Sequence, residues 1–426
     1  MIGAGPAGTA VSKVLARAGV AHDVLDENQR PGGNIDRRPL DAPATSFELT
    51  AANGAGRLLA GAHVVDLTPA RLVRWVTDGV LHEHEYEAVF VCTGAYDGSF
   101  SRPWSQRAGV TTVGALQALL KGQSIVPVGS VTLIGAGPFL WAAAADLRGK
   151  RVRVRAVVDR VPLHRYTWIM PFALLMPRRT VSFGWGMLRL LLSGTSLYFG
   201  REAQLTETGA VRVGGELVEA DHVAITDYFA PQTQLARTAN CVQAYNAVGQ
   251  YFFTASDRAG LTSTEGIYLC GEGQGIHGRE YAAVTGEIAA RAFVQTLGLR
   301  LSGGRFLSAH RALLRLYARR LERLMYPQGS FKVSPAAEAC TCEHVSMSQV
   351  ADAIEFGLRD LTSIKAVTRC GMGTCQGRYC EPIVTRMVAM SGQPPRAPFF
   401  QKGFVRPVPV AVLLPADQTQ EVGRVR

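Results

Sequence analysis

The sequence predicts an α/β protein with two nucleotide-binding βαβ units and a small α-helical domain that holds a metal centre. Three observations predict this fold class: a glycine motif at residues 3–8, a second glycine motif at residues 135–140, and five cysteines crowded between residues 340 and 380. Each glycine motif stands where a strand would turn into a helix, the arrangement that brings backbone amides close to a dinucleotide.

The first glycine motif has all three glycines of G-x-G-x-x-G but a very short leading strand. The nucleotide-contacting residues expected from it are Gly3, Gly5, Pro6, Ala7 and Gly8. A βαβ nucleotide fold ordinarily places about five apolar residues before the first glycine. Only two residues stand there, so we interpret the motif as a true site whose first strand is shortened or whose start is misassigned.

The segment after this motif supports that interpretation. Apolar residues recur at helical spacing over residues 11–18, and "HDVLDE" then reads as a strand that ends on Asp26 and Glu27. An acidic side chain about 20 residues beyond the glycines typically accepts the ribose hydroxyls of the dinucleotide. Asp26 stands near that distance from Gly8, so the motif and the acidic strand end agree.

Three later turns are also candidates for contact with the same cofactor. In each, a glycine or another small residue would let a phosphate or a ring approach the backbone. The pairs at Thr93 and at residue 271 each follow an apolar strand-like run. The candidate residues are Gly32, Gly33, Thr93, Gly94, Gly271 and Glu272.

The second glycine motif is incomplete. Gly135 and Gly137 repeat the first two glycines after a proper apolar strand, but Leu140 occupies the third position. The third glycine normally permits close packing of the helix on the strand. We therefore expect a second nucleotide-binding-like unit, with Gly135 and Gly137 as candidate contacts, and leave open whether it holds NAD(P), ATP or nothing.

The cysteine cluster is the strongest signal in the chain. Cys340 and Cys342 form a C-x-C pair, and Cys375 and Cys380 form a C-x4-C pair. Two close pairs of thiolates suit a [2Fe–2S] cluster, with two ligands on each iron. Zinc fits the C-x-C spacing less well, and unligated structural cysteines are the remaining alternative. Cys370 is expected to lie outside the ligand set.

Bulk composition excludes several classes of protein. The chain has 426 residues, 47% hydrophobic and 19% charged, and a formal charge of +11 that no nucleic-acid motif accompanies. The longest apolar stretch, residues 168–194, is broken by Pro171, Pro177 and two arginines, so we expect no transmembrane segment. The N-terminus lacks the features of a signal peptide. We expect a cytoplasmic protein that reaches the inner membrane, if at all, through its partners.

The order of these motifs resembles the α subunit of bacterial heteromeric FAD-dependent amine and amino-acid dehydrogenases. The family includes opine oxidase, hydrogen cyanide synthase and the hydroxyproline dehydrogenases. The resemblance covers about residues 1–415 and rests on "IGAGPAG", "RPGGNI", "CTGAYDGSF", "LIGAGPFL", "QLARTANC", "GIYLCGEGQGIHG" and "CTCEHV…TRCGMGTCQGRYC". The last motif is similar to the bacterioferritin-associated-ferredoxin type of [2Fe–2S] domain. Glu272 and Asn34 depart from the Asp and Gln that are usual in the family.

The resemblance implies a function. The fold would be that of the pyridine nucleotide-disulfide oxidoreductases, and the chain would be an FAD- and [2Fe–2S]-containing electron-transfer subunit. It would accept electrons from a flavin-containing amine-oxidising β subunit in a hetero-oligomer. The resemblance also allows an FMN bound at a subunit interface and a small ferredoxin-like subunit. No substrate-activating base is evident, which favours a relay over a complete enzyme. The alternatives are a stand-alone NAD(P)H-dependent flavin reductase and a non-catalytic scaffold with a structural nucleotide.

These expectations divide the chain into five parts. The first nucleotide-binding unit is split by the second, and a basic helix precedes the cysteine-rich domain. The predicted boundaries are 1–122 with 226–300 for the FAD-binding domain, 123–225 for the inserted unit, 301–335 for the basic helical linker, 336–390 for the [2Fe–2S] domain and 391–426 for an extended proline-rich tail.

Overall fold

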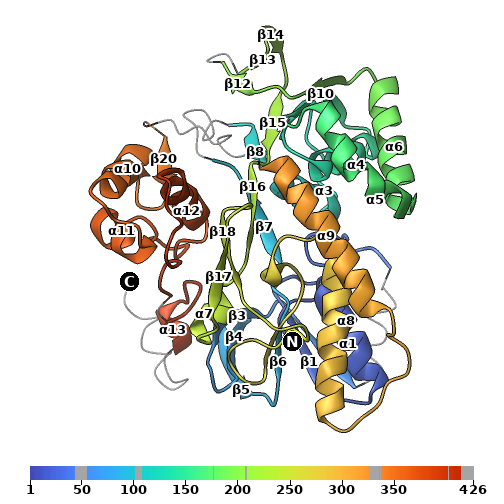
Figure 1. Ribbon diagram of the computed structural model, residues 1–426, viewed down its shortest axis with the longest axis vertical. Coiled ribbons are helices and arrows are strands. Elements are labelled where there is room, and N and C mark those ends of the chain that lie inside the picture. Colours follow the sequence, from blue (N-terminus) through green and yellow to red (C-terminus); the bar gives the residue numbers. More distant parts are fainter. Residues whose placement is uncertain are drawn as a thin grey trace.

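A computed structural model describes residues 1–43, 55–100, 108–175, 177–206, 209–326, 335, 337–401 and 403–413, with the side chains of 173–183 excepted. Figure 1 shows two α/β units one above the other, the long helices α8 and α9 along one side and the cysteine-rich domain on the opposite side. Among the described residues, no helix is both long and apolar enough to cross a membrane.

The first unit is built on a parallel sheet in which Ile2 occupies the central position. Ile2 bridges to Leu25 on one side and to Val91 on the other, and its N–H donates to the carbonyl of Phe90 at 2.9 Å. The order is therefore β2, β1, Ile2, β6 and β19. The flanking strands are β1 (His22–Asp26), β2 (Gly56–Ala60), β6 (Val89–Val91) and β19 (Ile267–Leu269).

Two helices cover one face of this sheet and meet each other closely. Helix α1 (Pro6–Arg17) starts directly after the glycine motif, and helix α8 (Arg279–Thr296) returns from the far end of the unit. Gly286 lies against Ala7, where a Cβ would come 2.3 Å from the Ala7 carbonyl oxygen. The small residues therefore let the two helices touch.

The remainder of the first unit consists of antiparallel pieces. A three-stranded meander comprises β3 (His63–Leu67), β4 (Leu72–Thr77) and β5 (Val80–Glu85). Two further pairs of antiparallel strands belong to this unit. They are β7 (Ala95–Gly98) with β16 (Tyr228–Pro231), and β17 (Gln243–Asn246) with β18 (Tyr251–Thr254); short helices α7 (Gln234–Thr238) and η2 (Gly271–Gln274) complete the unit.

The second unit has its own five-stranded parallel sheet, in the order β11, β10, β9, β15 and β8. Its strands are β8 (Val110–Thr112), β9 (Ser130–Gly135), β10 (Arg153–Asp159), β11 (Ser196–Phe199) and β15 (His222–Ile225). Because β8 pairs with β15, this unit begins near residue 109. This strand precedes the predicted boundary at residue 123 and belongs to the second sheet.

Helices and a small hairpin surround the second sheet. Helix α3 (Val113–Gly122), helix α4 (Pro138–Gly149), the 3-10 helix η1 (Leu163–Ile169), helix α5 (Met170–Leu175) and helix α6 (Pro177–Leu192) follow the strands. A small antiparallel sheet comes before β15 in the chain and consists of β12 (Ala203–Leu205), β13 (Val211–Val213) and β14 (Glu216–Val218). Helix α6 packs on α4 through the buried Leu190.

The predicted basic helix is α9 (Leu307–Met325), but it does more than link two domains. Its exposed side carries Arg315 and Arg319, while Leu324 is buried with Ala136 and Val161 of the second unit. Residues 327–334 and 336 of the predicted linker and cluster domain lie outside the described residues.

The C-terminal domain is small and helical, as expected. It contains the short strands β20 (Glu338–Cys340) and β21 (Val345–Ser346) and the helices α10 (Met347–Glu355), α11 (Leu361–Thr368) and α12 (Glu381–Met390). A capping box formed by Ser346 and Gln349 begins α10. The hydrophobic core of this domain includes Tyr228 and Phe252 from the first unit, so the two share one interior.

The tail after residue 390, for which the sequence predicts an extended conformation, is largely irregular in its described residues and contacts other parts of the chain. Phe399 is fully buried in the core of the cluster domain, and the N–H of Val405 donates to the carbonyl of Val65 at 2.8 Å. A short helix, α13 (Val410–Leu413), follows. The prediction for residues 414–426 lies outside the described part of the chain.

One buried ion pair joins the cluster domain to the first unit. Both terminal nitrogens of Arg237, on α7, contact the carboxylate of Glu381 at 2.6 Å, and Glu381 opens α12. The two side chains are 8% and 13% exposed. Removing one partner of such a pair leaves an uncompensated buried charge, which is strongly destabilising.

We expect Arg237→Met to lower the free energy of unfolding by about 3–5 kcal/mol, because Glu381 keeps its charge without a partner. The control is Arg57→Met, which breaks an exposed pair with Asp23 in which the arginine is 68% exposed; that change should cost less than about 1 kcal/mol. Urea unfolding of both variants measures the difference. Equal losses would contradict the role given to Arg237.

Candidate redox site

The glycines of the first motif form a tight cradle. Gly3 has φ +98°, and a Cβ there would lie 2.5 Å from the carbonyl oxygen of Cys92; a Cβ on Gly8 would lie 1.9 Å from the carbonyl oxygen of Gly3. Gly33, with φ +60°, closes over Gly5 in the same way. The predicted residues Pro6, Ala7, Thr93, Gly94 and Gly271 line the same pocket as Gly3, Gly5 and Gly33.

The two acidic residues at the end of β1 have different surroundings. Asp26 is buried, and its carboxylate accepts the N–H of Ala4 at 2.5 Å and both nitrogens of Asn28 at 2.8 Å. Glu27 is exposed at the pocket rim and pairs with Arg406 at 2.6 Å. Burial alone would raise the pKa of Glu27, but the Arg406 guanidinium holds it below its ordinary value. Asp26 thus braces the glycine loop, and Glu27 faces the pocket.

Glu272 stands where the first pocket meets a larger cavity. It lines both, together with Asn34 and Ala95. Its Oε1 accepts the N–H of Gly278 at 3.3 Å, and burial raises the pKa of its carboxyl group to about 7. His277 nearby stacks on Tyr281, and burial lowers its pKa to about 4, so the imidazole is neutral at pH 7.

The second glycine motif is covered by the chain itself. A Cβ on Gly137 would lie 2.7 Å from the Sδ of Met325 on α9. Asp159, at the end of β10, is fully buried and accepts the indole N–H of Trp141 at 2.7 Å and the hydroxyl of Tyr166. In a functional site these positions face the pyrophosphate and the ribose. Here side chains of the protein lie at both.

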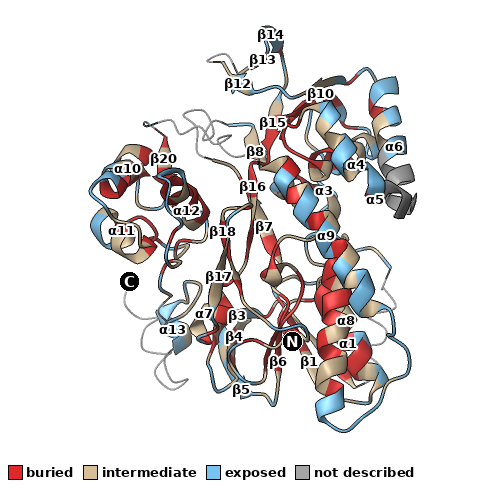
Figure 2. Cartoon of the chain, in the orientation of Figure 1, coloured by how far each residue is buried: buried red, intermediate tan, exposed pale blue. Residues whose placement is uncertain are grey.

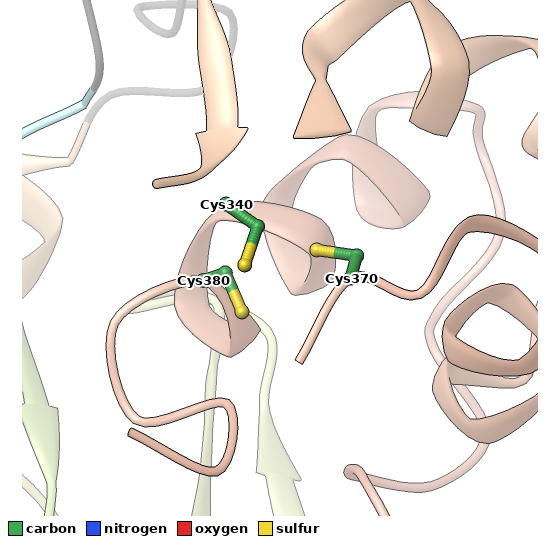
Figure 3. A group of neighbouring side chains, drawn as sticks. All are labelled: Cys340, Cys370 and Cys380. Atoms are coloured by element: carbon green, nitrogen blue, oxygen red, sulfur yellow. The ribbon is translucent and has the colours of Figure 1, made fainter. Parts of the chain in front are cut away.

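The structure brings three cysteines into one buried group (Figure 3). The Sγ atoms of Cys340, Cys370 and Cys380 lie within 4.8 Å of one another. Cys340 ends β20, Cys370 follows α11, and Cys380 directly precedes α12. The sequence placed Cys370 outside the ligand set, and its position beside two predicted ligands is the main difference at this site.

The remaining two predicted ligands lie next to each other at the rim of the group. Burial, chiefly, and the nearby Cys342 thiol raise the pKa of Cys375, and Cys342 is exposed whereas Cys375 is half-buried. The larger cavity is lined by Cys340, Cys342, Cys375 and Cys380; Cys370 is not among its lining residues. The four predicted cysteines therefore share one cavity wall, with Cys370 behind it.

The surroundings of Cys340 favour a thiolate. Hydrogen bonds from the thiols of Cys370 and Cys380 and from the backbone N–H groups of Gly371 and Glu343 lower the pKa of Cys340 to about 2. The same contacts with the Cys340 sulfur raise the pKa of Cys370 and of Cys380. Thiolates are the form in which cysteine ligates metals.

The larger cavity joins the two candidate sites. Its volume is about 1010 Å³, and it extends from Asn34 and Glu272 at the nucleotide pocket to the four cysteines of the C-terminal domain. The second unit contributes Phe139, and α9 contributes Met325. A volume of this size is within the range of ligand and cofactor sites.

Several residues that build the junction lie inside or near quoted motifs, such as Tyr96 in "CTGAYDGSF" and Arg378 in "CQGRYC", but nothing in the sequence indicates that they contact one another. The loop from Cys375 to Cys380 is held by contacts to the first unit. Tyr96 donates its hydroxyl to the carbonyl of Arg378, and the Arg378 guanidinium donates to Gln232 at 3.0 Å. These residues are distant in sequence and of ordinary types, so only the three-dimensional contacts reveal them.

The fold and the cysteine site together define a class of protein: a two-unit nucleotide-binding oxidoreductase fold that carries a C-terminal iron–sulfur domain. Residues 339–390 match the BFD-like [2Fe–2S] binding domain family, and residues 1–64 match the NAD(P)-binding Rossmann-like domain family. The predicted fold class is thereby confirmed.

Comparison with curated proteins identifies the family. An opine oxidase subunit of Agrobacterium tumefaciens (strain Ach5) is 32% identical over 438 residues, covering 91% of this chain and 84% of that protein. Hydrogen cyanide synthase subunit HcnB of Pseudomonas aeruginosa is 29% identical over 419 residues, covering 89% and 90%. The chain belongs to the family that contains this opine oxidase subunit and HcnB, and is an oxidoreductase subunit.

Solved structures support the fold. L-proline dehydrogenase from P. horikoshii is 17% identical, with a TM-score of 0.66, and the match covers 97% of this chain and 78% of that chain. Thioredoxin reductase from T. acidophilum is also 17% identical, with a TM-score of 0.52, over 70% of this chain and 97% of that one. The first match extends over the cysteine-rich domain as well as the two nucleotide-binding units.

We expect NADH not to bind at the second glycine motif, because Met325 lies against Gly137 and Asp159 is already hydrogen-bonded. Isothermal titration of the purified chain with NADH should give no saturable heat, and NADH should not reduce any chromophore of the chain under anaerobic conditions. Rapid bleaching by NADH would contradict this expectation.

Proposed function

We propose that the chain is the FAD- and [2Fe–2S]-containing electron-transfer subunit of a heteromeric amine or amino-acid dehydrogenase. The observation that carries the proposal is the cavity of about 1010 Å³ whose wall runs from the nucleotide pocket to the four cysteines. A flavin exchanges electrons in pairs or singly and a [2Fe–2S] cluster singly, so the two together connect two-electron oxidation with one-electron acceptors.

The first pocket has the features that FAD requires. Its glycine loop leaves no room for side chains at Gly3 and Gly8, which is how such loops admit a pyrophosphate to the backbone. Glu27 would accept the ribose hydroxyls, since Asp26 is engaged with Ala4 and Asn28. Glu272 lies farther along the pocket and would face the middle of the cofactor.

The cysteine site has the chemistry that a [2Fe–2S] cluster requires. The proposed ligands are Cys340, Cys342, Cys375 and Cys380, which line the same cavity. Cys370 lies behind this wall, within reach of Cys340 and Cys380, and would donate a hydrogen bond to a ligand sulfur. The loop that holds Cys375 and Cys380 is braced by Tyr96 and Gln232, so this chain keeps the site at a constant distance from the nucleotide pocket.

The family assignment supports a hetero-oligomeric assembly and an amine or amino-acid substrate. The curated relatives are subunits of opine oxidase and of hydrogen cyanide synthase, so we propose hetero-oligomeric assembly with an amine-oxidising subunit in the cytoplasm. The blocked second motif supports electron entry from that partner and disfavours an NAD(P)H-dependent reductase.

The experiment that tests the relay is analysis of iron and sulfide in single Cys→Ala variants of the full chain. We expect loss of the cluster for Cys340, Cys342, Cys375 and Cys380, because each removes one of four thiolates. Cys370→Ala should retain iron and sulfide. If Cys375→Ala kept its iron and sulfide and Cys370→Ala lost them, Cys370 would be a ligand in place of Cys375. Zinc without sulfide in anaerobically purified protein would refute the relay.

The flavin site has a separate test in Gly5→Val. The nearest atom to a Cβ on Gly5 is the Cα of Gly33 at 3.8 Å, so the fold tolerates the change while the branched side chain enters the pocket. We expect the variant to fold with its iron intact and to lose most of its FAD. The matched control is Gly149→Val at the end of α4, where a Cβ would have no atom within 4 Å and the backbone has no positive φ, and which lies away from the pocket. Full flavin content in Gly5→Val would contradict the site.

A further inference from the structure

A small recess lies between helix α9 and the loop that follows β18. Its volume is about 200 Å³, and it shares no lining residue with the nucleotide pocket or with the larger cavity. Two of its polar lining residues, Thr254 and Tyr281, are only 0% and 3% exposed. We call it the arginine recess and define it by Thr254, Ser256, Arg258, Tyr281, Arg311 and Arg315.

Helix α9 supplies two of the three arginines. The helix has a buried and an exposed side, as the red and pale-blue positions along it in Figure 2 show. Arg311 and Arg315 are four residues apart and therefore lie on the same side, and Arg319 and Arg323 continue the row. Like charges at this spacing destabilise a helix, so the row carries a cost that a bound anion would offset.

No acidic side chain in the described part of the chain forms an ion pair with Arg258, Arg311 or Arg315. Asp257 also lines the recess, but its Oδ1 accepts two backbone N–H groups of its own loop at 2.8 Å. The guanidinium of Arg311 donates to the carbonyl of Arg258, which ties α9 to this loop. The recess therefore holds more positive than negative charge.

The positive potential of these arginines extends to the buried residues behind them. Burial raises the pKa of Tyr281, and Arg315 and Arg311 oppose that rise. Burial lowers the pKa of His277, which stacks on Tyr281, and Arg315 lowers it further. A concave surface lined by charge of one sign concentrates small ions of the opposite sign.

The lining residues indicate the chemistry of a ligand. Guanidinium groups bind carboxylate and phosphate groups through parallel N–H···O hydrogen bonds, and the hydroxyl of Ser256 is a further donor. The volume is below the about 300–1,000 Å³ of pockets that enclose drug-sized ligands. The recess therefore suits one small anion.

We propose that the arginine recess binds a small oxyanion, the phosphate or carboxylate group of a metabolite. The site is separate from the two redox cofactor sites but close to one of them. The Gln274 side chain donates to the carbonyl of Leu269 at 2.7 Å and accepts the Tyr281 hydroxyl at 3.2 Å. Gln274 belongs to η2, which also carries Glu272 of the nucleotide pocket. The proposal does not depend on the cofactors or on the amine-oxidising partner.

The test is isothermal titration of the purified full chain with inorganic phosphate and, separately, with succinate, at an ionic strength held constant with sodium chloride. We expect saturable binding of at least one of them, and the tighter ligand distinguishes a phosphate from a carboxylate site. Arg315→Gln should weaken binding at least about tenfold, because it removes charge-assisted hydrogen bonds. Arg315→Lys should weaken it less, since it keeps the charge but loses the planar fork.

The matched control is Arg323→Gln, which changes an exposed arginine of the same helix that does not line the recess. This variant should bind the anion like the unaltered chain, and thermal unfolding should confirm that all variants are folded. Absence of saturable binding for both anions would overturn the proposal. Unchanged binding by Arg315→Gln would also overturn it, since the anion would then lie elsewhere, for example at the glycine loop. Equal weakening by Arg323→Gln would reduce the effect to a general attraction by the basic surface and would overturn it as well.

Discussion

The arrangement of the nucleotide pocket and the cysteine site depends on how helix α12 is anchored in the body of the protein. Arg386 on α12 is almost fully buried, and its guanidinium lies 4.6 Å from the ring centre of Tyr228 and 5.7 Å from that of Tyr326. It donates to the carbonyl of Gly249 at 2.9 Å. Burial lowers the pKa of Arg386, yet aromatic faces and a carbonyl surround the cation and compensate part of its lost hydration.

This anchor works together with the ion pair at the start of the same helix. Glu381 meets Arg237 of the first unit, and Cys380 immediately precedes Glu381. A shift of α12 would therefore separate a buried pair and expose a buried cation at once. The cysteine site is held by interactions whose loss would be costly, so its position relative to the nucleotide pocket is well determined.

The two nucleotide-binding units differ in what lies against their glycine motifs. In the first, backbone surrounds an open pocket; in the second, Met325, Trp141 and Tyr166 occupy the corresponding positions. The second unit supports α9, whose Leu324 is buried against Ala136 and Val161. Such a division is consistent with a subunit that takes electrons from a partner and does not oxidise a pyridine nucleotide.

The sequence alone determined the features that depend on local pattern. Glycine spacing predicted both nucleotide-binding folds, and Ile2, directly before Gly3, pairs with β1 on one side and β6 on the other. Cysteine crowding predicted the iron–sulfur domain, because ligand spacing within one short segment is readable without a fold. The acidic end of β1 was readable for the same reason, but the spacing pointed to Asp26 as the ribose contact, whereas Asp26 is buried and bonded to Ala4 and Asn28 and Glu27 lies at the pocket rim.

Tertiary structure alone decided the features that depend on contacts between distant residues. Strand β8 joined the second sheet because β15, more than a hundred residues later, offered a parallel edge. Cys370 lies beside Cys340 and Cys380 because α11 and α12 pack together. Met325 lies against Gly137 because α9 crosses the second unit. Sequence spacing predicts which chemistry a segment can perform, whereas only the folded chain places segments against one another, since that depends on complementary surfaces.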